Sequence, residues 1–199
     1  MLFRSTMKQK INSVIKAFLL FNLFAVVNTF GSEPQKVENF KLKDYNGKEF
    51  QLSDFKSSKA TVIMFVATQC PVSNAYNSRM AQLYADYKDK GVTFFGVNSN
   101  KQESVDEIKE HSKTNKLDFV ILKDPGNVIA DKFKASFTPE IYVLNGSMEI
   151  LYHGRIDDNR RESDVKEKDL RSALDEILAG KKVSSPETKA FGCTIKRIN

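Results

Sequence analysis

Residues of the kinds that bind metal ions are scarce in this sequence. It contains two histidines, His111 and His153, and neither has a partner at the spacing of a zinc site. The acidic pair Asp157-Asp158 does not fit the spacing of a calcium-binding loop. The sequence therefore predicts no metal site and no bound cofactor, and each histidine is expected on the surface or in a strand.

Cysteine is equally rare, with only Cys70 and Cys193 among the 199 residues. A chain of this length buries an adequate core without disulfide cross-links, so the two cysteines need not be structural. The stretch Cys70-Pro71-Val72-Ser73 has Ser at the position where a dithiol motif has its second Cys. A local disulfide is therefore excluded.

The apolar run near the N-terminus is too short for a membrane span. It extends from Ala17 to Val27, is interrupted by Asn22, and falls short of the about 20 residues that a spanning helix needs. Residues 1–31 contain four basic residues and no acidic one, which predicts a secretory signal peptide cleaved near residue 31. We therefore expect an exported protein, periplasmic or secreted, without stable membrane insertion after cleavage. An uncleaved membrane anchor is the alternative.

The excess of basic residues belongs largely to the predicted signal peptide. The whole chain has 31 Lys and Arg against 25 Asp and Glu, and four of the basic residues lie in residues 1–31. The mature part therefore keeps 27 basic and 25 acidic residues, a net charge of +2. Nucleic-acid binding needs a basic patch on the folded domain, so nucleic acid is not an expected partner.

The mature chain is expected to form one domain, residues 32–180, followed by a polar tail, 181–199, that carries Cys193. Alternating apolar and polar residues on both sides of Asn46-Gly47 predict an N-terminal hairpin. Short β-branched apolar runs predict strands, and apolar residues at helical spacing predict helices. The expected strands are 60–67, 92–97, 119–122, 140–144 and 149–153, and the expected helices are 71–90, 104–113, 127–133 and 168–179.

The order of these elements indicates the fold class. Strand 60–67, helix 71–90 and strand 92–97 form a βαβ unit, which implies parallel strands. The last two strands flank Asn145-Gly146 and are predicted to form an antiparallel hairpin. Together they predict an α/β sandwich with a central mixed sheet, an N-terminal hairpin and a C-terminal tail.

Cys70 lies between a predicted buried strand and a predicted helix. A helix N-terminus offers unpaired N–H groups and about half a positive charge, and both favour the thiolate, the nucleophilic form of cysteine. Pro71 fits the first helical turn because it has no N–H to leave unpaired there. We therefore predict that Cys70 is a reactive nucleophile. The alternative is a buried cysteine that serves only as a small apolar side chain.

A lone thiolate needs a second thiol to resolve the product of its attack. Cys193 is the only candidate within the chain, and it lies on a tail that can reach across the surface. We predict a redox couple of Cys70 and Cys193. A fixed structural bridge between them, or two unpaired thiols, are the alternatives.

Two other segments contain residues that would support a site at Cys70. Thr138-Pro139 precedes a predicted strand, and a cis bond there would present the Thr138 backbone to a substrate. From composition alone, however, an ordinary trans bond is expected. Arg155, in the cluster Gly154–Asp158, would stabilise a thiolate if it faced the site. The alternative for Arg155 is a local Arg–Asp ion pair in a loop.

Four motifs stand out in the mature chain: Thr68-Gln69-Cys70-Pro71, Thr138-Pro139-Glu140, Gly154-Arg155-Ile156-Asp157-Asp158 and Gly192-Cys193-Thr194-Ile195-Lys196. With them, residues 40–196 resemble the thioredoxin-like superfamily, in its peroxiredoxin-like branch of redoxin and alkyl-hydroperoxide-reductase-type domains. The resemblance implies a thioredoxin-like sandwich. It also implies that Cys70 occupies the reactive-cysteine position and Pro139 the cis-proline position.

The chain departs from both well-known patterns of this superfamily. Peroxiredoxins have Pro seven residues and Thr or Ser three residues before the reactive cysteine, where this chain has Ile63 and Ala67. The hydroxyl of Thr68 is next to the second of these positions. Thioredoxins have Trp before the first cysteine and a second cysteine three residues later, where this chain has Gln69 and Ser73. The missing hydroxyl favours disulfide exchange with a protein over peroxide reduction.

The sequence thus predicts an antioxidant-type thiol oxidoreductase. Cys70 would attack a peroxide or a protein disulfide, Cys193 would resolve the product, and an external thiol would restore both. The supporting residues are predicted to be Thr68, Pro71, Thr138, Pro139 and Arg155. The alternative is a non-catalytic binding module on the same scaffold, because a fold does not determine a function.

Overall fold

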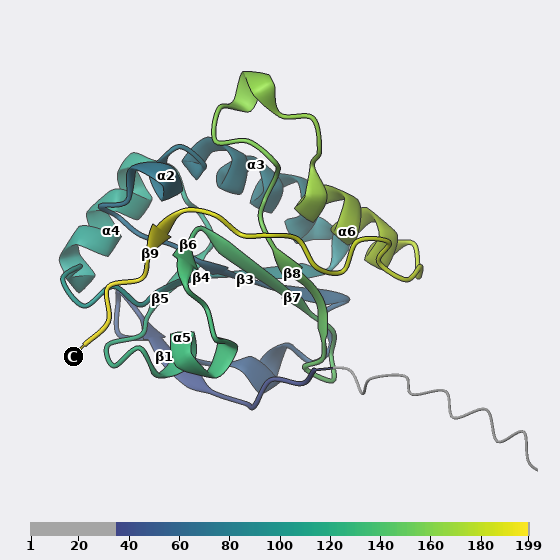
Figure 1. Ribbon diagram of the computed structural model, residues 1–199. Coiled ribbons are helices and arrows are strands. Elements are labelled where there is room, and N and C mark those ends of the chain that lie inside the picture. The colour runs from purple at the N-terminus through teal and green to yellow at the C-terminus, as the bar shows by residue number, and fades with distance from the viewer. Residues whose placement is uncertain (1–34, 199) are drawn as a thin grey trace, which may run out of the picture. The chain divides into compact units, whose positions relative to one another are not determined.

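The computed structural model describes residues 35–198, so the predicted signal peptide lies outside the described residues. A seven-stranded sheet in the order β2-β1-β5-β4-β3-β7-β8 forms its centre (Figure 1). Its strands are β1 (Lys41–Asp44), β2 (Glu49–Gln51), β3 (Ala60–Phe65), β4 (Val92–Asn98), β5 (Val120–Lys123), β7 (Glu140–Leu144) and β8 (Ile150–Gly154). The pairs β3–β4 and β4–β5 are parallel and the other pairs are antiparallel. The predicted α/β sandwich with a central mixed sheet is confirmed.

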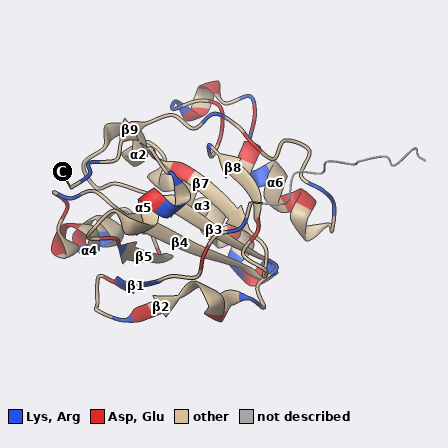
Figure 2. Cartoon of the chain, turned by 60° about the horizontal axis from the view of Figure 1, so that its bottom comes forward, with Lys and Arg blue, Asp and Glu red and all other residues tan. Residues whose placement is uncertain are grey.

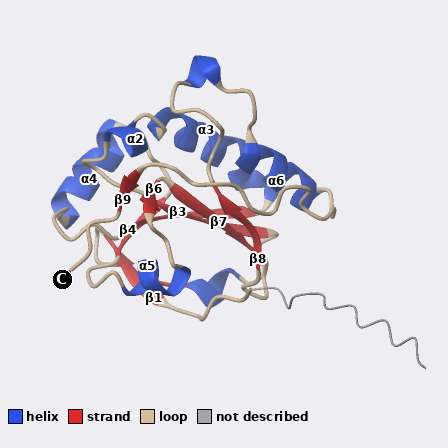
Figure 3. Ribbon diagram, viewed as in Figure 1, coloured by secondary structure: helices blue, strands red, loops and turns tan. Residues whose placement is uncertain are grey.

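Helices cover both faces of the sheet (Figure 3). They are α2 (Pro71–Asn74), α3 (Asn77–Tyr87), α4 (Val105–Thr114), α5 (Val128–Phe133) and α6 (Asp169–Leu178), with short 3-10 turns η1 (Leu52–Phe55), η2 (Lys88–Lys90) and η3 (Glu162–Asp164). Helices α3, α4 and α6 pack into one apolar core and α5 into the other. Among residues 35–198, no helix is long and apolar enough to cross a membrane.

Strand β3 is an interior strand of the sheet, between β4 and β7, and both of its faces are apolar. Val62 and Met64 belong to the core under α3 and α6, whereas Ile63 and Phe65 belong to the core under α5. Successive side chains of a strand point to opposite faces, so one strand contributes to two cores. Figure 2 shows β3 and β4 free of charged residues. The carboxyl end of β3 therefore delivers the following residues, including Cys70, from a fixed position.

The helix predicted over residues 71–90 is interrupted, so that prediction is wrong in its continuity. The N–H groups of Ala75 and Tyr76 donate to Val72 and Ser73, three residues back, as in a 3-10 turn. This tighter turn brings the ring of Tyr76, which is 1% exposed, into the core. Cys70 consequently precedes a separate one-turn helix, α2, and not the start of a long helix.

Local signals elsewhere predicted the structure well. The capping box at Ser104 and Glu107 is present at the start of α4, and Gly91 ends the helical segment at a φ of +88°. Both Asn-Gly segments connect antiparallel strands, β1 to β2 and β7 to β8. These features depend on residues close in sequence, which explains the agreement.

The C-terminal tail packs against the domain along most of its length (Figure 1). Its strand β9 (Cys193–Thr194) pairs antiparallel with β6 (Phe137–Thr138), outside the main sheet. Val183 and Ile195 are buried, at 7% and 5% exposure. The sequence predicted a polar tail that can reach across the surface, but it did not predict this additional strand pair.

Candidate redox site

Cys70 is the N-cap residue of α2. Its backbone is extended, at φ −84° and ψ 116°, and the N–H of Ser73 donates to its sulfur over 3.3 Å. Pro71 occupies the first position of the helix, as predicted. The Cys70 side chain is therefore in contact with a free helical N–H, a group that stabilises a thiolate.

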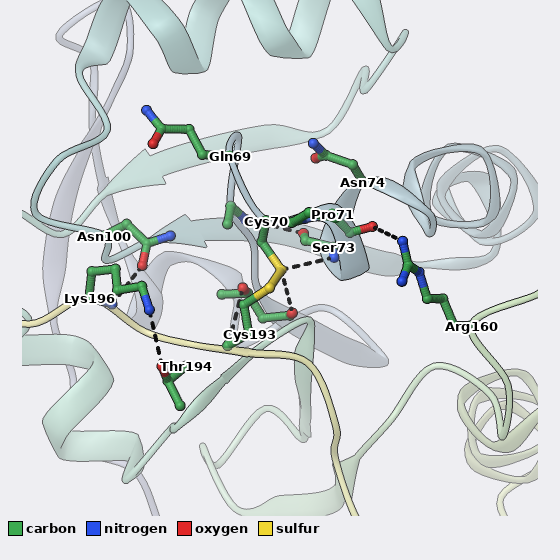
Figure 4. The surroundings of a disulfide bond; sticks show 12 residues. Gln69, Cys70, Pro71, Ser73, Asn74, Asn100, Arg160, Cys193, Thr194 and Lys196 are labelled. Atoms are coloured by element: carbon green, nitrogen blue, oxygen red, sulfur yellow. Dashed lines mark hydrogen bonds between the residues drawn. A yellow bond between two sulfur atoms is a disulfide. The ribbon is translucent and has the colours of Figure 1, made fainter.

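Cys193 is bonded to Cys70. The two residues form a disulfide with their Cα atoms 6.0 Å apart, although 123 positions separate them in the sequence (Figure 4). Cys70 is buried at 5% exposure, whereas Cys193 is partly exposed. Of the alternatives left open by the sequence, two unpaired thiols do not describe this structure.

The backbone of Thr138 contacts both cysteines. Thr138 is the direct strand partner of Cys193, and its carbonyl oxygen lies 3.4 Å from the Cys70 sulfur. The Thr138-Pro139 bond is cis, so the expectation of a trans bond from composition is wrong and the position implied by the resemblance is correct. The bond lies between β6 and β7, where β9 pairs with β6. Composition does not predict this tertiary environment, because it depends on a segment far away in the sequence.

Gly192 allows the tail to approach this closely. A Cβ atom at Gly192 would lie 2.1 Å from the carbonyl oxygen of Thr138 and 2.7 Å from its carbonyl carbon. Neither backbone atom can give way without moving β6. Glycine is therefore required beside Cys193 for steric reasons.

The Gly192→Ala variant is expected to impair formation of the disulfide. Because β9 must move away from β6, we expect the equilibrium constant for closing the Cys70–Cys193 bond to fall at least tenfold, or about 30 mV for a two-electron couple. Titration of free thiols in glutathione redox buffers measures this constant. Gly126→Ala is the control, because a Cβ there meets only a Val128 methyl group at 3.3 Å. Equal constants for Gly192→Ala and the wild type would contradict the steric argument.

A buried carboxylate holds the turn that precedes Cys70. Glu103 is 1% exposed and accepts hydrogen bonds from the N–H groups of Thr68, at 2.8 Å, and Gln69, at 3.0 Å. The side-chain amides of Asn98 and Asn100 donate to the same carboxylate. Four donors therefore converge on Glu103, which satisfies its buried charge and fixes the entry to α2.

Asn100 extends this cluster to the tail. Its amide nitrogen donates to Glu103 over 3.1 Å, and its amide oxygen accepts the N–H of Lys196 at 2.8 Å (Figure 4). The N–H of Lys101 donates in turn to the carbonyl of Lys196. One buried amide thus connects the turn before Cys70 to the segment that follows Cys193.

Lys123 provides the positive charge of the cluster. Its ammonium donates to the backbone carbonyls of Asn100 and Glu103, each over 2.7 Å. Burial lowers the pKa of Lys123, and the nearby carboxylate of Glu103 opposes that shift. No motif in the sequence pointed to Glu103, Asn100 or Lys123. The sequence feature that could have identified them is their position as polar residues at or after the ends of β4 and β5, the strands that run parallel to β3.

The other predicted supporting residues occupy distinct positions. The hydroxyl of Thr68 is buried and has no hydrogen-bond partner among residues 35–198. Arg155 donates to Asp169 of α6 over 2.7 Å, an ion pair whose partner lies on a helix and not in the loop. Its predicted action on the thiolate stays a prediction. The guanidinium that contacts the site is that of Arg160, which donates to the carbonyl of Pro71 over 3.3 Å.

Asp157 of the same charged cluster forms a buried ion pair with Arg79. Their closest atoms are 2.6 Å apart, and the Arg79 guanidinium lies 3.7 Å from the centre of the Tyr76 ring. Burial raises the pKa of Tyr76, and the neighbouring Asp157 adds to that shift. The ring also packs against Phe191, two residues before Cys193. The motif Gly154–Asp158 thus supports the interrupted helix under the site.

Glu140 supports the segment on which the tail docks. It follows Pro139, is 3% exposed, and accepts the N–H groups of Ser136 and Phe137 at 2.7 and 2.8 Å. His153 also contacts its carboxylate, at 2.8 Å. Burial raises the pKa of Glu140, but these hydrogen bonds outweigh it and the net shift is below the ordinary value of 4.5.

Acidification is therefore expected to remove a stabilising contribution of Glu140. A carboxyl whose pKa is lowered on folding stabilises the protein above the ordinary value of 4.5, and the contribution is lost as the pH falls through the folded-state pKa. The wild type should thus exceed Glu140→Gln in stability at neutral pH, and the difference should shrink below pH 4.5. Urea unfolding at neutral pH and below pH 4.5 measures this difference in stability. Glu167→Gln, at an exposed position, is the control for the change of charge. A difference independent of pH would contradict the assignment.

Several known proteins are similar to this chain in sequence or in structure. A sequence profile of the AhpC/TSA family matches residues 34–158. Thiol-disulfide oxidoreductase ResA of Halalkalibacterium halodurans is 25% identical over 139 residues, which are 70% of this chain and 77% of that protein. Peroxiredoxin Q of Gentiana triflora is 27% identical over 143 residues, 67% of this chain and 63% of that protein.

A shorter match has higher identity. A probable phospholipid hydroperoxide glutathione peroxidase of Solanum lycopersicum is 39% identical over 70 residues, 35% of this chain and 41% of that protein. The chain thus spans less than two thirds of the length of two of these three curated relatives.

Two crystal structures match most of the chain. A hypothetical protein of Sinorhizobium meliloti has a TM-score of 0.78 at 30% identity, over 83% of this chain and 94% of that one. An uncharacterized conserved protein of Geobacillus kaustophilus has a TM-score of 0.77 at 30% identity, over 82% of this chain and 90% of that one.

Proposed function

The chain belongs to the AhpC/TSA family, and we propose that it is a thiol oxidoreductase in which Cys70 is the nucleophile and Cys193 the resolving thiol. This membership confirms the peroxiredoxin-like resemblance, and the matched residues contain three of the four sequence motifs. One observation carries the proposal: the sulfur at the start of α2 is bonded to the sulfur of a strand that docks beside it.

The first half of the proposed cycle oxidises the protein. The Cys70 thiolate attacks one sulfur of a substrate disulfide, whose S–S bond breaks and releases one thiolate. Cys193 then loses its proton to solvent and attacks the Cys70 sulfur, which releases the second substrate thiolate. The substrate disulfide is reduced by two electrons, and the two protein thiols become the Cys70–Cys193 disulfide.

The second half reduces the protein again. An external thiolate forms a bond to the more exposed sulfur, that of Cys193, and the electron pair of the broken bond leaves on Cys70. The N–H of Ser73 stabilises this leaving thiolate. A second external thiol releases Cys193, so two external thiols become one disulfide.

The tail favours a protein disulfide as the substrate. Strand β9 is an extended segment that carries a cysteine, and it pairs with β6 next to Cys70. Backbone pairing of this kind is how sheet edges bind extended peptides. A substrate segment with a cysteine therefore matches the geometry that the chain's own tail adopts there.

Peroxide is the second candidate substrate, supported by the peroxidase and peroxiredoxin names among the relatives. In that reaction the Cys70 thiolate attacks an O–O bond, becomes a sulfenic acid and releases water or an alcohol. Attack by Cys193 on the sulfenic sulfur then releases water and forms the same disulfide.

Product analysis tests the proposal. The fully reduced protein is mixed separately with a disulfide-containing peptide and with hydrogen peroxide, and thiols and mass are followed in time. We expect loss of both thiols, a product two hydrogens lighter, and a faster reaction with the peptide. If both thiols persisted in both mixtures, the non-catalytic binding module would be the better description.

We propose further that the protein works outside the cytoplasm, either in a periplasm or as a secreted protein. The composition of residues 1–31 supports this, because a basic start followed by a short apolar run directs export. A disulfide also forms and persists in such a compartment. Detection of a mature N-terminus near residue 32 in the exported fraction of expressing cells is the expected result.

A further inference from the structure

The surroundings of the disulfide indicate which external thiols reduce it. Two exposed cations flank the bond, one beside each cysteine (Figure 4). Arg160 donates to the carbonyl of Pro71, which follows Cys70, and the ammonium of Lys196 donates to the hydroxyl of Thr194, which follows Cys193, each over 3.3 Å. Each cation is thus hydrogen-bonded to the residue that follows one of the two cysteines.

These cations are not neutralised by acidic partners. Arg160, Lys196 and the exposed neighbour Lys101 form no ion pair with a carboxylate in the described part of the chain. The Lys101 N–H donates to the Lys196 carbonyl, which keeps the two lysines on adjacent segments. Figure 2 shows basic residues on the tail, and basic and acidic residues together on the loop between β8 and α6. The charges are therefore available to a reactant from solution.

Three carboxylates on the elements around the bond are engaged by other groups. Glu107 accepts the Gln69 side chain and caps α4 through the Ser104 N–H. Glu103 is buried, accepts four donors, and has Lys123 beside it. Asp131 of α5 is paired with Arg197 of the tail. These three carboxylates therefore have hydrogen-bond or ion-pair partners of their own, whereas Arg160 and Lys196 have no carboxylate partner among the described residues.

We infer that the reductant of the Cys70–Cys193 disulfide is an anionic thiol, one with negative charge near its reactive sulfur. This inference rests on the proposed function and adds the charge class of the reducing partner. The partly exposed Cys193 sulfur is the point of attack, and the attacking thiolate passes between Arg160 and Lys196 to reach it. Their charge attracts the thiolate and stabilises the transition state, where negative charge is shared among three sulfurs.

Three small thiols of different charge test the inference. The oxidised mature protein, with its tail intact, is reduced with glutathione, which is anionic, with neutral 2-mercaptoethanol, and with cationic cysteamine. Rate constants are compared per thiolate and corrected for thiol basicity, because both change the rate of thiol–disulfide exchange. We expect glutathione to exceed cysteamine by about tenfold at low ionic strength.

Salt and charge variants identify the cause of that preference. Raising the salt from about 0.01 M to about 1 M shortens the Debye length from about 30 Å to about 3 Å and should remove most of the preference. The double variant Arg160→Gln/Lys196→Gln should remove it at low salt. The control Lys56→Gln/Lys182→Gln changes the net charge equally at exposed positions away from the disulfide and should keep the preference.

The outcomes separate this inference from the proposed function. Equal rate constants for the three thiols, or an unchanged preference in Arg160→Gln/Lys196→Gln, would overturn the inference and leave the thiol chemistry intact. A disulfide that none of the three thiols reduces would overturn the proposed function itself. Far-ultraviolet circular dichroism of each variant establishes that the fold is kept.

Discussion

Replacing Cys70 with Ser is expected to reduce turnover to the rate measured without protein. A serine hydroxyl does not ionise near neutral pH, so the N–H of Ser73 has no anion to stabilise. The variant also loses the disulfide, because Cys193 has no other cysteine to pair with. Consumption of an anionic thiol in the presence of a disulfide peptide measures turnover.

Cys193→Ser is the matched variant and should behave differently. We expect its first step to proceed near the wild-type rate and then stop, with a mixed disulfide or a sulfenic acid on Cys70. Mass spectrometry of the trapped species identifies the modified residue. Wild-type turnover in Cys70→Ser would disprove its role as nucleophile, and wild-type turnover in Cys193→Ser with the same external thiol would disprove its role as resolving residue.

Glu103→Gln is expected to cause the largest loss of stability among single substitutions at the site. Each carboxylate oxygen accepts two donors, so an amide nitrogen in place of one oxygen leaves two of them unsatisfied and adds another donor. It also removes the carboxylate that acts most strongly on the partly buried Lys123, although Asp124 and Glu107 remain. Breaking a buried charged cluster costs about 3–5 kcal/mol, and we expect a loss of that order.

Urea unfolding of the oxidised protein measures this loss. Glu107→Gln is the control, since Glu107 also accepts Gln69 but does so at an exposed position, and its effect should be far smaller. We further expect slower closure of the disulfide in Glu103→Gln, because the turn before Cys70 and the Asn100 contact to Lys196 both depend on the carboxylate. Similar stabilities for the two variants would contradict the central role of Glu103.

The parts of the fold that sequence predicted are those with local causes. The run 60–67 is apolar except at Thr61, so its first six residues form a strand that contributes to two cores. The capping box of α4 needs only residues 104–107. The N-cap position of Cys70 follows from the same kind of signal, a strand end followed by Cys-Pro. Such features are decided by neighbours along the chain.

The parts that sequence did not predict have partners far away in the chain. The interruption before α3 is stabilised by Tyr76 packing on Arg79 and Phe191, and β9 exists only because β6 lies beside it. Glu103 likewise gains its importance from Thr68 and Gln69, more than thirty positions earlier. A single sequence contains no record of such contacts.

The disulfide closes a covalent ring that contains most of the domain. Because Cys70 and Cys193 are 123 positions apart, a pulling force applied at the two chain ends is carried across the sulfur–sulfur bond and bypasses β4, β5, β7 and β8. The oxidised chain can therefore lengthen only by the residues outside the ring. Reduction would release about 400 Å of additional contour length. The redox state of this protein therefore determines how far a pulling force can extend it.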